Sequence, residues 1–160
     1  MKKTIVSVLL LPLILLMLTS CQKNISTNDA ARTTELKKNS NGTIWVMNIQ
    51  LSGLNEVPPN DLGATGNALL RVTADKVLHS KVNVDAPPEA GTLVAAHIHS
   101  GAAGVNGPVK IFLCHSTDEF GVNMEIQLTD EQFNMLMNDH LYVNAHSTVK
   151  PAGLLRGQIR

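Results

Sequence analysis

The sequence is poor in aromatic residues, in cysteine and in net charge. Its 160 residues include one Trp, one Tyr, three Phe and two Cys, and 13 basic residues balance 13 acidic ones. Small aliphatic side chains must therefore fill most of any core. Because there is no basic stripe with interleaved aromatics, we exclude nucleic acid as a partner.

The sequence also lacks the motifs of most enzyme classes. It contains no P-loop, no dinucleotide-binding glycine pattern after a strand, no G-x-S-x-G elbow and no paired-cysteine metal site. At 160 residues the chain is most simply one domain, which excludes large multidomain enzymes. The sequence leaves enzymatic activity uncertain and favours a non-catalytic protein.

The N-terminus has the order of a secretory signal. Two lysines precede an apolar run over residues 5–17, which is too short to span a bilayer comfortably. The run ends at Leu18-Thr-Ser-Cys21, which resembles the bacterial lipobox. We therefore expect residues 1–20 to be a lipoprotein signal peptide and Cys21 to be acylated. The alternative is an ordinary signal peptide with an incidental cysteine.

A lipid on Cys21 would be the membrane attachment, because no later apolar run reaches the length of about 18 to 20 residues of a spanning helix. The polar stretch up to Gly42 indicates a flexible tether over residues 21–42. We expect a protein of the bacterial cell envelope, lipid-anchored at the outer membrane or cell surface. Cys114 then has no intramolecular partner, so the exported domain must be stable without a disulfide.

Residues 43–160 predict an all-β domain, because apolar residues recur mostly with a period of two. Gly- and Pro-containing connections separate the runs. Eight strands are predicted, at residues 45–51, 66–74, 76–84, 92–99, 109–114, 124–128, 141–146 and 154–159. These elements favour an antiparallel, Greek-key-like β-sandwich or barrel.

One helix is predicted, over residue 130 to about residue 139. Thr129 is in the N-cap position and Gln132 follows three residues later, which is a capping-box pattern. Phe133, Leu136 and Met137 lie on one face, which we expect to pack on the sheet.

Three histidines form the candidate metal site. His97 and His99 are two residues apart on one strand, which places both imidazoles on one face within about 7 Å. His146 ends another strand and supplies a third nitrogen if the two strands pair or face each other. Three imidazoles suit copper or zinc. In the purely structural alternative, these histidines hydrogen-bond to carbonyls of the glycine-rich loop.

The loop after His99 contains Gly101, Gly104 and Gly107. We expect it to fold back over the histidine pair, with at least one glycine at positive φ. Glu56 and Arg156 complete the one polar cluster, in which the carboxylate accepts loop amides or pairs with the guanidinium.

The remaining candidate residues receive structural interpretations. Cys114 lies on the strand face opposite Ile111 and Leu113, and we interpret it as a packed thiol and not as a nucleophile. His79, His115 and His140 are interpreted as surface or loop residues.

Several sequence runs together resemble the CHRD domain, a family named for repeats in chordin, an extracellular antagonist of bone morphogenetic proteins. The resemblance covers about residues 43–160. It implies an extracellular β-sandwich module without established catalytic activity and with an unknown ligand. The runs are LSGLNEVPP (51–59), ATG (64–66), AAHIHSGAAGVNGPV (95–109), LYVNAH (141–146) and GLLRGQI (153–159).

A fainter similarity is to copper–zinc superoxide dismutases, which also have a His-x-His strand, a later strand ending in His and a near-terminal Arg. In that family the three histidines bind copper and the arginine guides the anionic substrate, which by resemblance implies those roles for His97, His99, His146 and Arg156. His115 has a plausible spacing for a fourth ligand. The long zinc loop and the cysteine expected after the arginine are missing.

The leading hypothesis is thus a lipid-anchored, non-catalytic CHRD binding module whose partner is an unidentified protein or a metal. The rival is a copper-binding protein similar to superoxide dismutase.

Overall fold

The structure is a computed structural model that describes residues 42–160. The predicted signal peptide, the acylation site Cys21 and nearly all of the predicted tether lie outside these residues. Within residues 42–160, no helix is long and apolar enough to cross a membrane.

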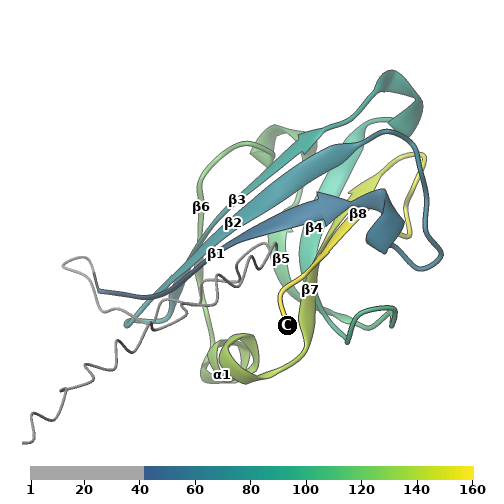
Figure 1. Ribbon diagram of the computed structural model, residues 1–160. Helices are drawn as coiled ribbons and strands as arrows, with labels where there is room; N and C mark the ends of the chain where they lie inside the picture. The colour runs from purple at the N-terminus through teal and green to yellow at the C-terminus, as the bar shows by residue number, and fades with distance from the viewer. Residues whose placement is uncertain (1–41) are drawn as a thin grey trace, which may run out of the picture. The chain divides into compact units, whose positions relative to one another are not determined.

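Eight antiparallel strands form one sheet that curls into a nearly closed barrel (Figure 1). The sheet order is β5-β4-β7-β8-β1-β2-β3-β6. The predicted all-β antiparallel class is therefore confirmed, and of the sandwich and the barrel the structure has the barrel-like form. The strands are β1 (Thr43–Ser52), β2 (Thr65–Thr73), β3 (Val77–Asp85), β4 (Leu93–Ser100), β5 (Val109–Cys114), β6 (Met124–Gln127), β7 (Leu141–Ser147) and β8 (Leu155–Gln158).

The strands form where side chains alternate between core and surface. In β1, Trp45, Ile49 and Leu51 are buried, whereas Val46 and Asn48 between them are exposed. This alternation is the pattern of a strand with one face on the core. Short 3-10 helices stand in three connections, η1 (Gly53–Asn55), η2 (Pro88–Ala90) and η3 (Thr117–Glu119).

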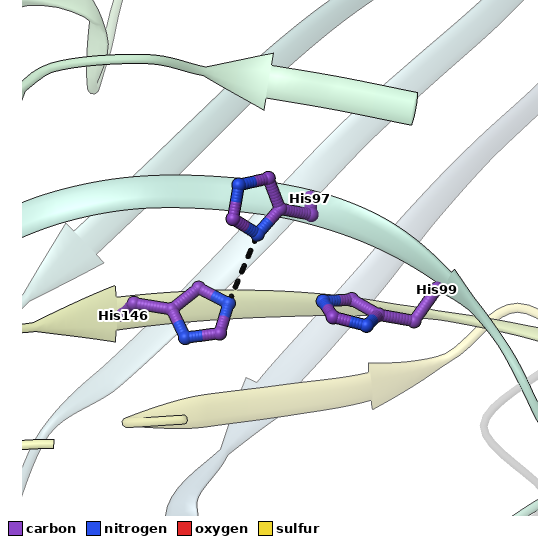
Figure 2. Close-up of side chains that lie close together, drawn as sticks. All are labelled: His97, His99 and His146. Atoms are coloured by element: carbon purple, nitrogen blue, oxygen red, sulfur yellow. Dashed lines mark hydrogen bonds between the residues drawn. The ribbon is translucent and has the colours of Figure 1, made fainter. Parts of the chain in front are cut away.

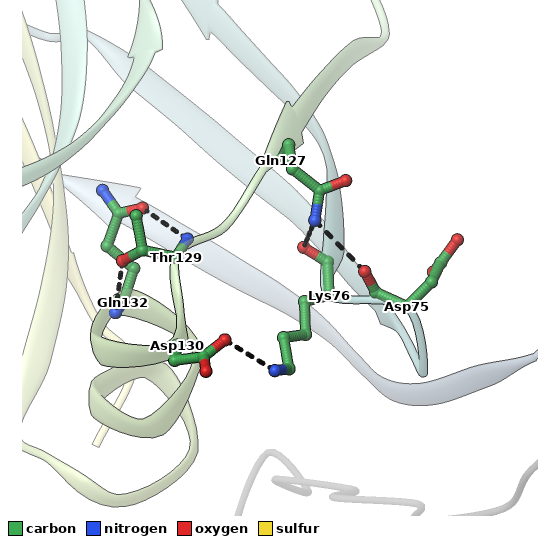
Figure 3. A network of polar contacts seen from close by, with 6 residues as sticks. All are labelled: Asp75, Lys76, Gln127, Thr129, Asp130 and Gln132. Carbon is green, nitrogen blue, oxygen red and sulfur yellow. Dashed lines mark hydrogen bonds and ion pairs between the residues drawn. The ribbon is translucent and has the colours of Figure 1, made fainter.

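The single α-helix, α1 (Asp130–Asn138), begins at the predicted capping box (Figure 3). The hydroxyl of Thr129 accepts from the Gln132 amide at 3.1 Å, and the Gln132 side chain accepts from the Thr129 amide at 3.0 Å. Lys76, in the β2–β3 turn, pairs with Asp130 at 2.6 Å. Leu136 is fully buried, so the helix packs its apolar face against the barrel core, as predicted.

One strand departs from simple alternation. All seven residues of β7 are buried, so both of its faces are covered. One face contributes Val143 and Ala145 to the hydrophobic core. The other face carries Tyr142, Asn144 and His146, and it is the place where the candidate site lies.

Candidate metal centre

The register of β4, β7 and β8 places the site residues on one face of the sheet. Across paired strands, His97 is opposite Asn144, and Asn144 is opposite Arg156. His99 is opposite Tyr142. Because directly paired residues project to the same side, these side chains share the barrel's outer face.

The connection between β4 and β5, residues 101–108 and hereafter the glycine loop, folds back over this face. The φ angles of Gly101 and Gly104 are 156° and 76°, which confirms the expected positive φ. Gly107 has no space for a side chain, because an added Cβ would lie 1.6 Å from the Ser100 carbonyl oxygen. The glycines therefore allow a close cover over the histidines.

The structure brings His97, His99 and His146 together. One nitrogen from each ring lies within 4.8 Å of the others, and Figure 2 shows the three rings turned toward one another. The closest pair is His97 Nδ1 and His146 Nε2, 3.1 Å apart. His99 and His146 are buried and His97 is half-buried.

Main-chain carbonyls set the protonation of two rings. His99 Nδ1 lies 2.9 Å from the Gly107 oxygen, and His146 Nδ1 lies 3.0 Å from the Pro151 oxygen. A carbonyl only accepts, so each Nδ1 carries the proton and donates it. In the neutral ring Nε2 then holds a lone pair, which in His146 points at His97.

The site concentrates buried polar atoms that have no partner. Among residues 42–160, five buried side-chain nitrogen or oxygen atoms lack a hydrogen bond, and three of these are His97 Nε2, His99 Nε2 and Asn144 Oδ1. Such atoms are costly, because water is lost and nothing replaces it. The unpaired Nε2 of His99 is therefore the atom for which a ligand would compensate most directly.

Burial keeps all three rings neutral at pH 7. It is the largest cause that lowers the pKa of His97 to about 4, with the nearby His146 and His99 adding to it. Burial also lowers the pKa of His99 and of His146, although their carbonyl bonds act in the opposite direction. Neutral imidazole is the form that binds metal, so metal binding at pH 7 does not require the cluster to lose a proton.

The residues present fit a transition-metal ion. Metal–nitrogen bonds of about 2.0 to 2.1 Å place coordinated nitrogens about 2.8 to 4.2 Å apart, from neighbouring to opposite positions of a square plane, with about 3.3 to 3.4 Å in a tetrahedron. The observed spread of up to 4.8 Å requires only a small ring movement to reach that range. The carbonyl bonds that the purely structural alternative expected are also present, but each occupies only Nδ1, so that Nε2 keeps its lone pair.

Glu56 follows the η1 connection directly and lies beside Asn144, which is opposite His97. It is 6% exposed, and its Oε1 accepts from Asn144 Nδ2 at 2.8 Å. Burial raises the pKa of Glu56 to about 7, against the opposing charge of Arg156 and the bond from Asn144. No Glu56–Arg156 ion pair forms within the described chain. The side-chain partner is Asn144, which the sequence did not indicate, and the main chain of Val57 adds a bond of the expected loop-amide kind.

Arg156 is 1% exposed, and its guanidinium carbon lies 3.5 Å from the centre of the Tyr142 ring. It donates to two carbonyl oxygens of the glycine loop, those of Ala102 at 2.8 Å and Val105 at 3.0 Å. A pocket of about 500 Å³ borders Glu56, Arg156 and Gly104. The predicted polar cluster is thus present, but its arginine faces the loop.

The other sequence candidates lie apart from the triad. Cys114 is fully buried, and burial raises the pKa of its thiol to about 11, which agrees with a packed, unreactive side chain. His115 is exposed and stacks on Phe112 with ring centres 5.0 Å apart. His79 pairs with Glu125 at 3.1 Å, and His140 is exposed. His115 is outside the group of three, although its charge helps to lower the pKa of His97.

Sequence reasoning missed the groups that hold the site in place. Asn144 shares the alternation of His146, which is a signal that could have marked it. The carbonyls of Gly107 and Pro151 leave no signal in side-chain pattern, because any residue carries a carbonyl.

Comparisons with known proteins agree with this architecture. No curated protein and no solved structure matches the chain. The sequence profile of the CHRD domain matches residues 47–159, which include every strand from β2 to β8 and all the residues of the site. The chain therefore belongs to the CHRD domain family.

Proposed function

We propose that this CHRD domain binds a copper or zinc ion through His97, His99 and His146. One observation carries the proposal. The carbonyls of Gly107 and Pro151 take the Nδ1 protons of His99 and His146, so that both Nε2 atoms offer lone pairs inside a buried cluster. Metal-binding histidines characteristically have their second nitrogen fixed in this way.

His97 would supply the third nitrogen. Its Nδ1 lies 3.1 Å from His146 Nε2, and in the metal-free protein it serves as the donor of that bond. On metal binding both nitrogens would turn to the ion, and the proton of His97 would move to its Nε2, which has no partner. Three neutral imidazoles leave the ion its full charge and at least one open position.

Copper is the stronger candidate of the two metals. Copper(II) binds a given nitrogen site more tightly than zinc does. The order of His97, His99, His146 and Arg156 along the chain also resembles that of copper–zinc superoxide dismutases. When bound, the ion would supply Lewis-acid or redox chemistry at a half-buried position, while the protein supplies its ligands and excludes most water.

Titration of the purified, chelator-treated protein tests the proposal. We expect copper(II) and zinc(II) each to saturate at about one equivalent, and His99→Ala to weaken binding by orders of magnitude. His140→Ala is the matched control, because His140 is exposed and lies outside the cluster. Equal, weak binding by wild type and both variants would leave the histidines as structural hydrogen-bonding groups.

We further propose that the domain is displayed in the bacterial cell envelope by a lipid on Cys21. The support is the lipobox-like Leu18-Thr-Ser-Cys21 and the polar stretch that follows. Each buried acyl CH₂ contributes about 0.8 kcal/mol, so two or three chains anchor a protein durably. Cys21→Ser should release the domain from the membrane fraction. Retention of that variant at the full precursor length would contradict lipid anchoring.

A further inference from the structure

We infer that Arg156 is a positioning residue for the histidine cluster, which it controls by holding the glycine loop whose Gly107 carbonyl fixes the protonation of His99. The part of this inference that concerns metal affinity rests on the proposed function. The part that concerns the loop and the His99 ring is independent of any metal.

Arg156 is buried. A guanidinium that is 1% exposed must find acceptors within the protein, because water no longer serves it. Its acceptors in the loop are the Ala102 and Val105 carbonyls and, at 3.3 Å, the side-chain oxygen of Asn106. It also donates to the side-chain oxygen of Gln158 at 3.4 Å. Three residues of the glycine loop are thus tied to one planar group on β8.

The glycine loop is connected to His99 by a hydrogen bond. Gly107 follows Asn106 directly, and its carbonyl accepts from His99 Nδ1 at 2.9 Å. The Gly107 amide in turn donates to the Tyr142 hydroxyl at 3.1 Å. A loop held by Arg156 therefore presents one carbonyl at a fixed place, and this carbonyl selects the His99 form with a lone pair on Nε2.

A second contact reinforces the path. The Tyr142 ring lies against the Arg156 guanidinium at 3.5 Å and stacks on the His99 ring, with centres 5.0 Å apart and planes 11° apart. Arg156 thus positions the His99 ring both through the loop and through Tyr142. Both contacts require a flat, multiply donating cation, which lysine does not provide.

The same contacts distinguish this role from guidance of an anionic substrate. Both hydrogens of the outer nitrogen that faces the loop, Nη2, are taken by the Ala102 and Val105 carbonyls. These two donors are committed to the loop and are not available to an anion.

The test is the protonation pattern of the histidine rings in the metal-free protein, measured by long-range ¹H–¹⁵N correlation spectra. We expect wild-type His99 to carry its proton on Nδ1 alone. Arg156→Lys should give His99 a mixture of the two neutral forms. Arg71→Lys is the matched control, because Arg71 bonds the Thr43 hydroxyl away from the site, and its spectrum should equal that of wild type.

If Arg156→Lys does not fold, Asn106→Ala decides. Asn106 is exposed and links the loop to Arg156 and, at 2.9 Å, to the Val57 carbonyl, so its loss leaves no buried charge without a partner. A second neutral form of His99 in this variant supports the inference. The inference is overturned if the His99 spectrum is unchanged in folded Arg156→Lys. If that variant does not fold, an unchanged His99 spectrum in Asn106→Ala overturns it.

Copper titration of the same variants separates this inference from the proposed function. We expect the affinity to fall about 10- to 100-fold in Arg156→Lys, the usual effect of losing a group that orients a ligand, and to be unchanged in Arg71→Lys. If wild type binds no copper but the His99 forms still change, the proposed function fails and the positioning role of Arg156 stands.

Discussion

The two halves of the sheet treat their outer faces differently. In the half formed by β1, β2, β3 and β6, outward side chains reach solvent, as Val46 and Leu69 do with 45% and 42% exposure. In the half formed by β5, β4, β7 and β8, the outward face of β7 is as buried as its core face. In the first half the sheet is thus covered on its core face, whereas β7 in the second half is covered on both faces.

The polar outer face of β7 is covered by loops and not by a helix. Over β7 the cover consists of the glycine loop and the η1 connection, which contribute main-chain carbonyls and the buried Glu56. Burial under such a cover lowers the pKa of the triad histidines and raises the pKa of Glu56. On the open half the amides of Asn48, Asn67 and Asn83 bond one another in a row at the surface.

The largest expected effect comes from opening the cover. Gly107→Ala places a Cβ 1.6 Å from the Ser100 oxygen, so the loop must rearrange. We expect it to lower the free energy of unfolding by more than about 3 kcal/mol, measured by urea denaturation. Gly104→Ala meets open space and costs only the strain of positive φ, about 1 to 2 kcal/mol. Equal losses would mean that the loop is not a tight cover.

The stability of the protein should depend on pH through Glu56. Because the pKa of Glu56 is raised from 4.5 to about 7 on folding, its neutral form stabilises the fold fully below pH 4.5, and this stability is lost as the pH rises through 7. Glu56→Gln has no such loss. Between pH 4.5 and 8, the unfolding free energy of wild type should therefore fall by about 3 kcal/mol relative to that of Glu56→Gln. Each tenfold change in an ionisation constant corresponds to about 1.4 kcal/mol.

Urea denaturation at a series of pH values measures this difference. The lowered pKa values of the histidines change stability in the opposite direction as the pH falls below 6.5, but they act in both proteins and cancel in the comparison. A difference that does not vary with pH would show that folding does not raise the pKa of Glu56.

The smallest effects come from one substitution made on both halves. Asn144→Ala removes the amide that donates to Glu56 under the cover, and we expect a loss of about 2 kcal/mol at pH 8. Asn67→Ala breaks two amide bonds in the surface row, where water replaces them, and the change should stay within about 0.5 kcal/mol. Similar losses at both positions would remove the distinction between the two halves.

Much of the fold could be predicted from the sequence because the strands alternate and the turns contain Gly and Pro. Each predicted strand lies within about two residues of its observed bounds, and the helix follows from Thr129 and Gln132. The same alternation predicted that His97 and His99 share a face, and the place of His146 followed from the expectation that its strand lies beside theirs.

The surroundings of the triad could not be predicted in the same way. Arg156 bonds carbonyls of the glycine loop and Glu56 bonds Asn144, whereas the sequence offered Glu56 either loop amides or Arg156. These bonds depend on where a loop without periodicity places its main chain, and residue types do not encode that place.

X-ray absorption at the copper edge of the copper-loaded protein distinguishes a three-histidine site from other modes of copper binding, because it counts the imidazoles around the ion. We expect three imidazole nitrogens at about 2.0 Å in wild type and two in His99→Ala. A wild-type spectrum with one imidazole or none, and with ligands unchanged in His99→Ala, would contradict it.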